Sequence, residues 1–218
     1  MRVRTTTALV IAVMLVTATA AARDAWAGAP TEQVRTQIER AIKVLEDPEL
    51  TKESRMPERR AAIRRIANDI FDFTETTRRS LGPHWQARTP QEREEITRLF
   101  ADLLERSYIG KIEMYSGEKI QFIGDSVDGD QANVRTRLVT KQGTEVPVDY
   151  RMHRVGDRWL TYDVSIEGVS LVANYRAQFN KIIQTSGYPA LVKKLVAKEQ
   201  EGMQADREVP VKKASQAK

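Results

Sequence analysis

The chain has 218 residues, no cysteine and a formal net charge of +5. Without cysteine it forms no disulfides, and a chain of this length buries the core of a single domain without such cross-links. Three arginines and one aspartate in the first 27 residues account for +2 of the charge, so the rest of the chain has an ordinary balance that gives no indication of nucleic-acid binding.

The first 27 residues have the pattern of a secretory signal peptide. Arg2 and Arg4 precede an apolar run over residues 8–22, which is short for a membrane span. Ala25-Trp26-Ala27 places small residues where signal peptidase reads them, so we expect cleavage after Ala27; an uncleaved N-terminal anchor is the alternative. No cysteine is present for acylation, and no later segment is apolar enough to span a bilayer. The sequence predicts an exported, soluble mature chain.

Helices are expected from residue 31 onward. We expect Thr31 to cap a first helix, and a charged connection containing prolines, residues 47–57, to separate it from a second. Leu81-Gly82-Pro83 ends the helical stretch that follows. One face of the first helix carries Val34, Ile38, Ala41, Ile42 and Leu45, and one face of the second carries Ile63, Ile66, Ile70 and Phe73.

The next helix has the clearest start signal in the chain. Thr89-Pro90-Gln91-Glu92 places a hydroxyl at the N-cap, proline at the first helical position and glutamate two residues later, the pattern of a capping box. An apolar stripe typical of a core helix follows: Ile96, Leu99, Phe100, Leu103, Leu104, Tyr108, Ile112 and Tyr115.

From Lys119 the apolar residues alternate at period two, which predicts four strands. Asp128-Gly129, Gln142-Gly143 and Gly156-Asp157 mark short turns between them, so the strands are expected to form an antiparallel meander. The apolar positions of the strands are Ile120 and Phe122; Val134, Thr136 and Leu138; Val146, Val148, Tyr150 and Met152; and Leu160, Tyr162, Val164 and Ile166.

The segment Trp159–Phe179 reads as a strand that turns directly into a helix. Alternation places Trp159, Thr161, Asp163 and Ser165 on the face opposite Leu160, Tyr162, Val164 and Ile166. Gly168 is expected at the corner with a positive φ, and Ser170 as the N-cap of the helix. A last helix is predicted from Pro189 to about Glu199, and residues 201–218 are expected to be a disordered polar tail.

The pattern W-x-x-Y-D-V-x-x-E-G-V-S-L-V-x-N-Y-R-x-Q-F over Trp159–Phe179 closely resembles the MlaC/toluene-tolerance family of exported lipid carriers. Further family motifs occur in the same order: Phe71-Asp72-Phe73, Leu81-Gly82-x-x-Trp85, Thr89-Pro90, Phe100-x-x-Leu103-Leu104-x-x-x-Tyr108 and Tyr150-Arg151. The resemblance covers almost the whole mature chain, but not the 47–57 connection or the tail.

The resemblance implies an α+β fold: an NTF2-like curved antiparallel sheet of about four strands, wrapped by helices that enclose an apolar cavity. It implies a single lipid-binding domain over residues 28–200, located in the periplasm. Members of this family carry phospholipid acyl chains between an outer-membrane lipoprotein–porin complex and an inner-membrane ABC transporter with an MCE-domain subunit. We expect a monomer without cofactor, metal or catalytic residue. A carrier of hopanoid-type lipids and a structural adaptor without a cavity remain alternatives.

Apolar face and family motif together select the residues expected to contact the lipid. They are Tyr108, Ile112, Tyr115, Val134, Val148, Tyr150, Tyr162, Val164, Val169, Val172, Tyr175 and Phe179. Tyrosines suit a cavity rim because each has an apolar ring and a hydroxyl that reaches water or a headgroup.

An enzyme on the same fold is the competing hypothesis. Asp163 or Glu167 would act as its acid or base on an apolar substrate. The sequence has no G-x-S-x-G motif or Gly-rich phosphate loop, and His84 and His153 are not spaced as zinc ligands. We expect His153 to face outward, and Arg176 to form an internal ion pair with Asp163 or Glu167.

Overall fold

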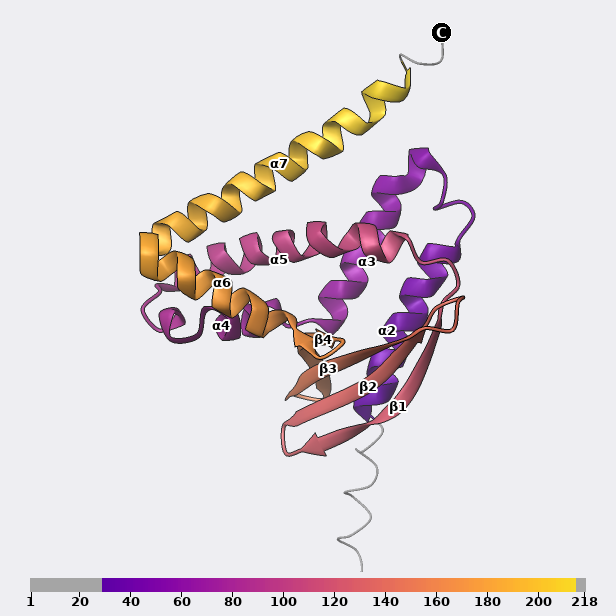
Figure 1. Ribbon diagram of the computed structural model, residues 1–218, viewed down its shortest axis with the longest axis horizontal. Coiled ribbons are helices and arrows are strands. Elements are labelled where there is room, and N and C mark those ends of the chain that lie inside the picture. The colour runs from indigo at the N-terminus through magenta and orange to yellow at the C-terminus, as the bar shows by residue number, and fades with distance from the viewer. Residues whose placement is uncertain (1–28, 215–218) are drawn as a thin grey trace, which may run out of the picture.

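The computed structural model describes the backbone of residues 29–214 and the side chains of residues 30–204. The predicted signal peptide, residues 1–27, lies outside the described residues. Helices come first, then the strands, then two further helices (Figure 1). The elements are α2 (Ala29–Glu46), η1 (Glu53–Arg55), α3 (Met56–Ile70), α4 (Phe73–Leu81), η2 (Gly82–Trp85), α5 (Pro90–Glu113), β1 (Lys119–Asp128), β2 (Gln131–Val139), β3 (Glu145–Val155), β4 (Arg158–Ile166), β5 (Val169–Ser170), α6 (Leu171–Ser186) and α7 (Tyr188–Ala214).

The strands form one antiparallel sheet in the order β1-β2-β3-β4-β5. The meander and its three turns are as predicted, and with the surrounding helices they confirm the NTF2-like α+β fold. The two-residue strand β5 is an addition, because the chain does not pass directly from β4 into α6. Glu167 and Gly168, with φ of 51° and 81°, form a tight hairpin turn first. The positive φ expected at Gly168 is confirmed.

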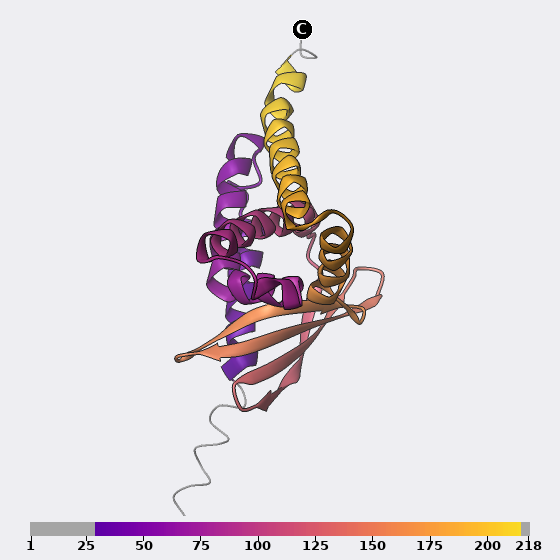
Figure 2. The ribbon, with the colours of Figure 1, turned by 90° about the vertical axis from the view of Figure 1, so that its left-hand side faces the viewer.

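One face of the sheet packs against the N-terminal half of α2. Val34 of α2 is buried together with Ala132, Val134, Met152 and Trp159. The opposite face carries exposed arginines of β2 and β3. The helices gather on one side of the sheet, which leaves the other side open to solvent (Figure 2).

A bulge in β4 changes which of its residues face α2 and the cavity. Tyr150 lies opposite Val164, but two residues further along β3 Met152 lies opposite Thr161. Because directly opposite residues share a face, Thr161 lies on the same face as Val164. The simple alternation predicted for β4, which separated Trp159 and Thr161 from Val164, was therefore wrong, because one extra residue at the bulge shifts the phase.

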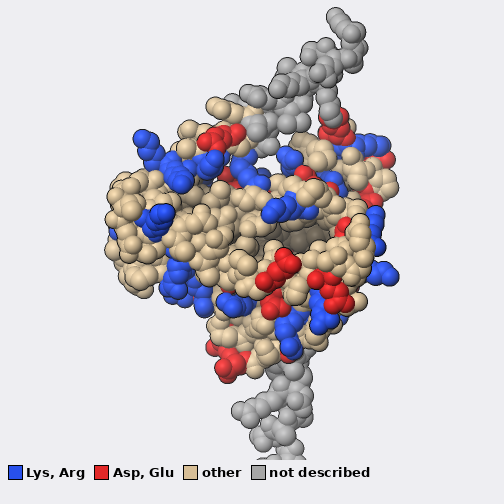
Figure 3. All heavy atoms as spheres, in the orientation of Figure 1, with Lys and Arg blue, Asp and Glu red and all other residues tan. Residues whose placement is uncertain are grey.

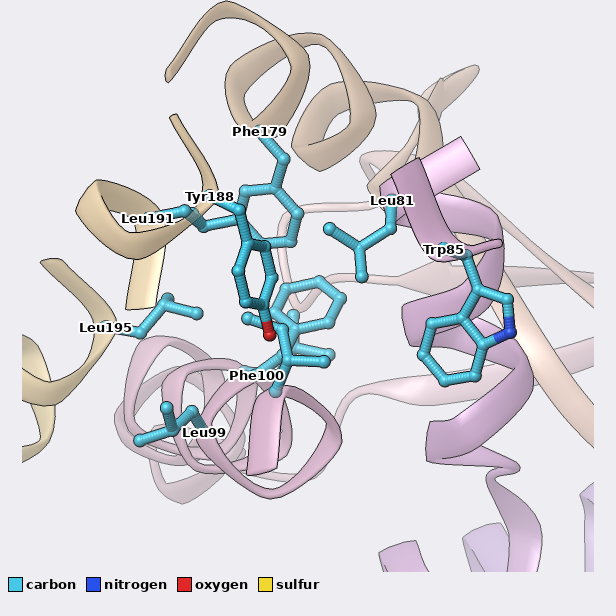
Figure 4. Packing of buried hydrophobic residues seen from close by; sticks show 10 residues of the cluster. Leu81, Trp85, Leu99, Phe100, Phe179, Tyr188, Leu191 and Leu195 are labelled. Carbon is cyan, nitrogen blue, oxygen red and sulfur yellow. The ribbon is translucent and has the colours of Figure 1, made fainter. Parts of the chain in front are cut away.

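A second apolar cluster joins α4, α5, α6 and α7 at the end of the molecule away from the sheet. The Phe100 ring makes edge contacts with Tyr175 and Phe179, each at 4.9 Å between ring centroids. Tyr188 and Leu191 of α7 point into the same cluster (Figure 4). This packing fixes the N-terminal half of α5 and leaves the other half to extend over the sheet.

Two of the three predicted helix caps are confirmed. Thr89 and Glu92 form the capping box of α5, and the Ser170 hydroxyl accepts a hydrogen bond from the Ala173 N–H at 3.0 Å. The N-cap predicted at Thr31 was wrong, because α2 already begins at Ala29. The Thr31 N–H and hydroxyl instead donate to Asp125 Oδ2, at 3.0 and 2.7 Å, and tie α2 to β1.

The last helix is longer than the sequence indicated. The backbone of α7 is helical through Ala214, and its distal end projects from the body (Figure 1). Residues 199–208 are rich in Glu, Gln, Ala and Met, which favour helix and account for the extension. No helix within the described residues is long and apolar enough to cross a membrane.

Candidate functional site

A cavity of about 860 Å³ lies between the sheet and the helices. It separates three clusters of buried apolar residues: the α2–sheet cluster, the α4–α7 cluster, and a third formed by Leu45, Ile63 and Ile66. A domain of this size ordinarily has one contiguous core. In this protein the apolar residues do not pack into one core but surround a cavity.

Six helices, four strands and the loops beside them contribute the cavity wall. The C-terminal half of α2 diverges from the sheet, so its apolar face turns from the sheet to the cavity. The apolar lining comprises Ile38, Ala41, Ile42 and Leu45 of α2; Ile63, Ile66, Ala67 and Ile70 of α3; Phe71 and Phe73; Phe100, Ala101, Leu104, Tyr108, Ile109 and Ile112 of α5; Met114, Tyr115, Ile120 and Leu138; Val148, Tyr150, Tyr162, Val164 and Ile166 of β3 and β4; and Leu171 and Val172 of α6.

Most residues selected from the sequence line this cavity. Helix α5 and the loop after it contribute three of them, and β3, β4 and the start of α6 contribute the rest, so segments far apart in the chain meet around one space. These residues are Tyr108, Ile112, Tyr115, Val148, Tyr150, Tyr162, Val164 and Val172.

The other four selected residues lie elsewhere. Val134 is fully buried beneath α2, and Val169 on β5 is 61% exposed to solvent. Tyr175 and Phe179 pack against Phe100 in the α4–α7 cluster. None of these four lines the cavity, because a shared apolar face does not distinguish packing against a neighbouring element from facing a space.

Sequence reasoning missed the walls contributed by α2 and α3. Their apolar faces were recognised from helical periodicity but were not assigned to the cavity wall. The available signal was the quantity of apolar surface: two helices with full apolar stripes flank a small sheet that only one of them can cover.

The cavity wall disfavours negative charge on two of its tyrosines. Burial raises the pKa of the Tyr150 hydroxyl from 10.0 to about 12, although a hydrogen bond to Thr136 opposes the shift. Burial also raises the pKa of Tyr108 on the facing helix. Both shifts show surroundings that disfavour a charged phenolate, as expected of a site for apolar groups.

Charged side chains surround the opening of the cavity. Arg64 of α3 pairs with Glu105 of α5, and Arg98 of α5 pairs with Glu199 of α7. All four line the cavity, together with Asp102, Lys111 and Glu118. Figure 3 shows the hollow, with basic side chains above its opening and acidic side chains below it. The wall is apolar and the rim is polar.

Asp163 holds the corner between β4 and α6. One carboxylate oxygen accepts the Ser170 hydroxyl at 2.6 Å and an Arg151 N–H at 3.3 Å, and the other accepts the Val172 N–H at 3.0 Å. The partner predicted for Asp163, Arg176, was wrong. Arg176 is exposed on α6 with its guanidinium against Gly82, because the first turn of α6 carries it away from β4.

The remaining candidate catalytic groups also have structural partners or lie away from the cavity. His84 bonds Asn180 at 2.9 Å, and Glu167 is exposed in the hairpin turn. His153, expected to face outward, instead bonds Asp72, the N-cap residue of α4, at 3.0 Å, because pairing of Phe71 with Thr161 brings the start of α4 beside β4. Among the described residues, no three His, Cys, Asp or Glu side chains gather in a group that would hold a metal ion.

Comparison with known proteins agrees with this architecture. A solved structure, the phospholipid-binding protein from Ralstonia solanacearum in complex with a phospholipid, superposes with a TM-score of 0.65 at 24% identity. The match covers 79% of this chain and 97% of that protein. At this identity the similarity establishes the fold.

Sequence comparison identifies relatives of the same kind. The intermembrane phospholipid transport system binding protein MlaC of Haemophilus influenzae is 24% identical over 138 residues. That match covers 60% of this chain and 64% of the relative, slightly less than two thirds of its length. The family described as MlaC protein matches residues 35–197, most of the chain. The chain therefore belongs to the MlaC family.

Proposed function

We propose that this protein is a periplasmic lipid carrier that binds the acyl chains of a phospholipid in the cavity. The observation that carries the proposal is the cavity itself, about 860 Å³ in volume and lined mainly by aliphatic and aromatic side chains. Ligand pockets are typically about 300–1,000 Å³, so this one is near the upper end of the range. The names of the Ralstonia and Haemophilus proteins, both of which describe phospholipid binding, support this choice of ligand.

The energetics suit a carrier. Transfer of acyl chains from water to an apolar site stabilises them by about 0.8 kcal/mol per methylene, or roughly 20 kcal/mol for a diacyl lipid. In a bilayer the chains are already in an apolar environment, so almost none of this free energy favours extraction. Net transport then requires partners that bind the loaded and empty carrier with different affinities.

We propose two such partners, in line with the MlaC family: an inner-membrane ABC transporter with an MCE-domain subunit, and an outer-membrane lipoprotein–porin complex. The Haemophilus relative is named as the binding protein of an intermembrane system, which supports this placement. In this proposal the carrier is one domain over residues 28–200, exported by the signal peptide and monomeric. The transporter, not the carrier, hydrolyses ATP.

An enzymatic function is less well supported. Asp163 lines the cavity, but its two oxygens accept hydrogen bonds from Ser170, Arg151 and the Val172 N–H. A carboxylate engaged in this way is a poor acid or base, because proton transfer would break bonds that hold α6 to β4. Glu167, the other candidate, is exposed in a turn.

The test is native mass spectrometry of the purified full chain. We expect a mass increment equal to one phospholipid, its loss on delipidation, and its return after incubation with phospholipid vesicles. If a polycyclic lipid is recovered instead, the proposed carrier function stands but its cargo is not a phospholipid. A protein that stays empty with vesicles of either lipid would contradict the proposal, and turnover of the added lipid would favour the enzyme.

A further inference from the structure

Three basic residues line the cavity: Arg64, Arg98 and Lys111. The two arginines are neutralised by Glu105 and Glu199. Lys111 is different, since no carboxylate among the side chains described in residues 30–204 forms an ion pair with it. Among the described residues that line the cavity, Lys111 is therefore the basic group whose charge no salt bridge matches.

The position of Lys111 is defined by its neighbour on the helix. Lys111 is in the last turn of α5, and its Nζ lies 5.3 Å from the centroid of the Tyr108 ring, which also lines the cavity. A cation–π contact of this kind holds the ammonium group over the ring. The Lys111 side chain is exposed, whereas Tyr108 is half-buried. The ammonium group thus lies at the boundary between the apolar wall and solvent.

A diacyl lipid bound by its chains must place its phosphate at the same boundary. We propose that Lys111 contacts this phosphate and determines a preference for phosphate-bearing lipids over neutral lipids with the same chains. The inference rests on the proposed function, since it takes acyl chains to fill the cavity. An ammonium–phosphate contact is a charge-assisted hydrogen bond, stronger than a neutral one, and a diacylglycerol has no group to form it.

A purely structural role is the competing explanation. A lysine in the last turn stabilises any helix by interaction with the helix dipole. Lys43 provides a matched control, because it is the basic residue in the last turn of α2, it is exposed, and it does not line the cavity. The Lys43→Ala variant removes the same charge from the same kind of position.

The experiment measures binding of dioleoyl phosphatidylethanolamine and dioleoylglycerol, each supplied as a fluorescent monomer, to delipidated protein. We expect Lys111→Ala to weaken phospholipid binding about tenfold and to leave diacylglycerol binding unchanged, while Lys43→Ala changes neither and Lys111→Arg retains the preference. The preference should shrink as salt screens the charge. Melting curves of all variants verify that each is folded.

Two results would overturn the assignment: an unchanged ratio of phospholipid affinity to diacylglycerol affinity in Lys111→Ala, whether or not both affinities fall, or the same loss of phospholipid affinity in Lys43→Ala. Lys111 could contact free phosphate instead of a lipid phosphate, and competition with inorganic phosphate distinguishes the two. We expect millimolar phosphate not to compete with the phospholipid. Competition would assign Lys111 to free phosphate instead. If wild-type protein binds neither lipid, the proposed function fails, and this outcome is distinct from failure of the Lys111 assignment.

Discussion

Substitution of Val148 by tryptophan tests whether the space beside β3 is a binding cavity or packed core. Val148 is half-buried, lines the cavity and lies opposite Ile166 in β4. An indole at this position projects into the space assigned to acyl chains. If it displaces three or four methylenes, binding weakens by about 3 kcal/mol, on the order of 100-fold.

The same change has a different effect in a packed core. Overpacking costs about 1–3 kcal/mol of unfolding free energy, and each kcal/mol lowers the melting temperature of a chain of this size by about 2–4 °C. The assay pairs affinity for a monomeric fluorescent phospholipid with a melting curve of the delipidated protein. Val127→Trp is the matched control, because Val127 is an exposed strand valine outside the cavity.

We expect Val148→Trp to lose affinity with an unchanged melting temperature, and Val127→Trp to retain both. A Val148→Trp protein that binds lipid as wild type does would refute the placement of the acyl chains. A Val148→Trp protein with a lower melting temperature that cannot be saturated with phospholipid would indicate that Val148 lies in packed core.

Three further predictions concern stability. Asp163→Asn weakens charge-assisted hydrogen bonds at the β4–α6 corner, and we expect it to lower the unfolding free energy, measured in urea, by about 2 kcal/mol, whereas Arg176→Ala changes it by less than about 0.5 kcal/mol. Equal losses in the two variants would indicate that Asp163 pairs with Arg176 after all. Gly82→Ala is expected to lower the unfolding free energy by about 1–3 kcal/mol, since the φ of Gly82 is 56° and a Cβ there would lie 2.8 Å from Arg176 Nε. If the double variant with Arg176→Ala recovers all of this loss, the contact with Arg176 and not backbone strain is responsible. Between pH 10 and about 12 Tyr150 keeps its proton in the folded protein but releases it in the unfolded chain, so its contribution to folding stability is complete below pH 10 and declines above it. Tyr150→Phe should therefore flatten the decline in melting temperature at alkaline pH, and an unchanged decline would contradict this.

Much of the fold could be predicted because its signals are local. The capping box at Thr89 and the glycine-containing turns each depend on a few adjacent residues, so they identified α5 and the meander. The bulge in β4 has no comparable signal, since it arises from how two strands align. Without it, the faces of Trp159 and Thr161 were assigned incorrectly.

The candidate site was less accessible from sequence. Periodicity indicates which face of Val134 or Phe179 is apolar, but whether that face meets a neighbour or a space depends on distant elements. Val134 is covered because the N-terminal half of α2 crosses the sheet there, whereas Tyr150, its partner on β3, faces the cavity. The difference lies in the path of α2, which no local pattern specifies.

Arg176 shows the same limit for ion pairs. Its closeness to Asp163 in sequence favoured a contact between them. The structure instead uses Arg151, which lies directly opposite Asp163 across the β3–β4 ladder. Strand pairing brought the charges together, and sequence separation gave no guide to it.

The location of the acyl chains is the central claim, and photocrosslinking tests it most directly. Delipidated protein is loaded with a phospholipid that carries a diazirine near the end of one acyl chain, irradiated, and digested for peptide mass spectrometry. The structure predicts adducts on peptides from the cavity wall, such as those containing Ile66, Ile109 or Tyr150, and none on the part of α7 that contains Leu191 and Leu195. Adducts confined to that part of α7 or to the exposed face of the sheet would contradict a carrier that encloses lipid in this cavity.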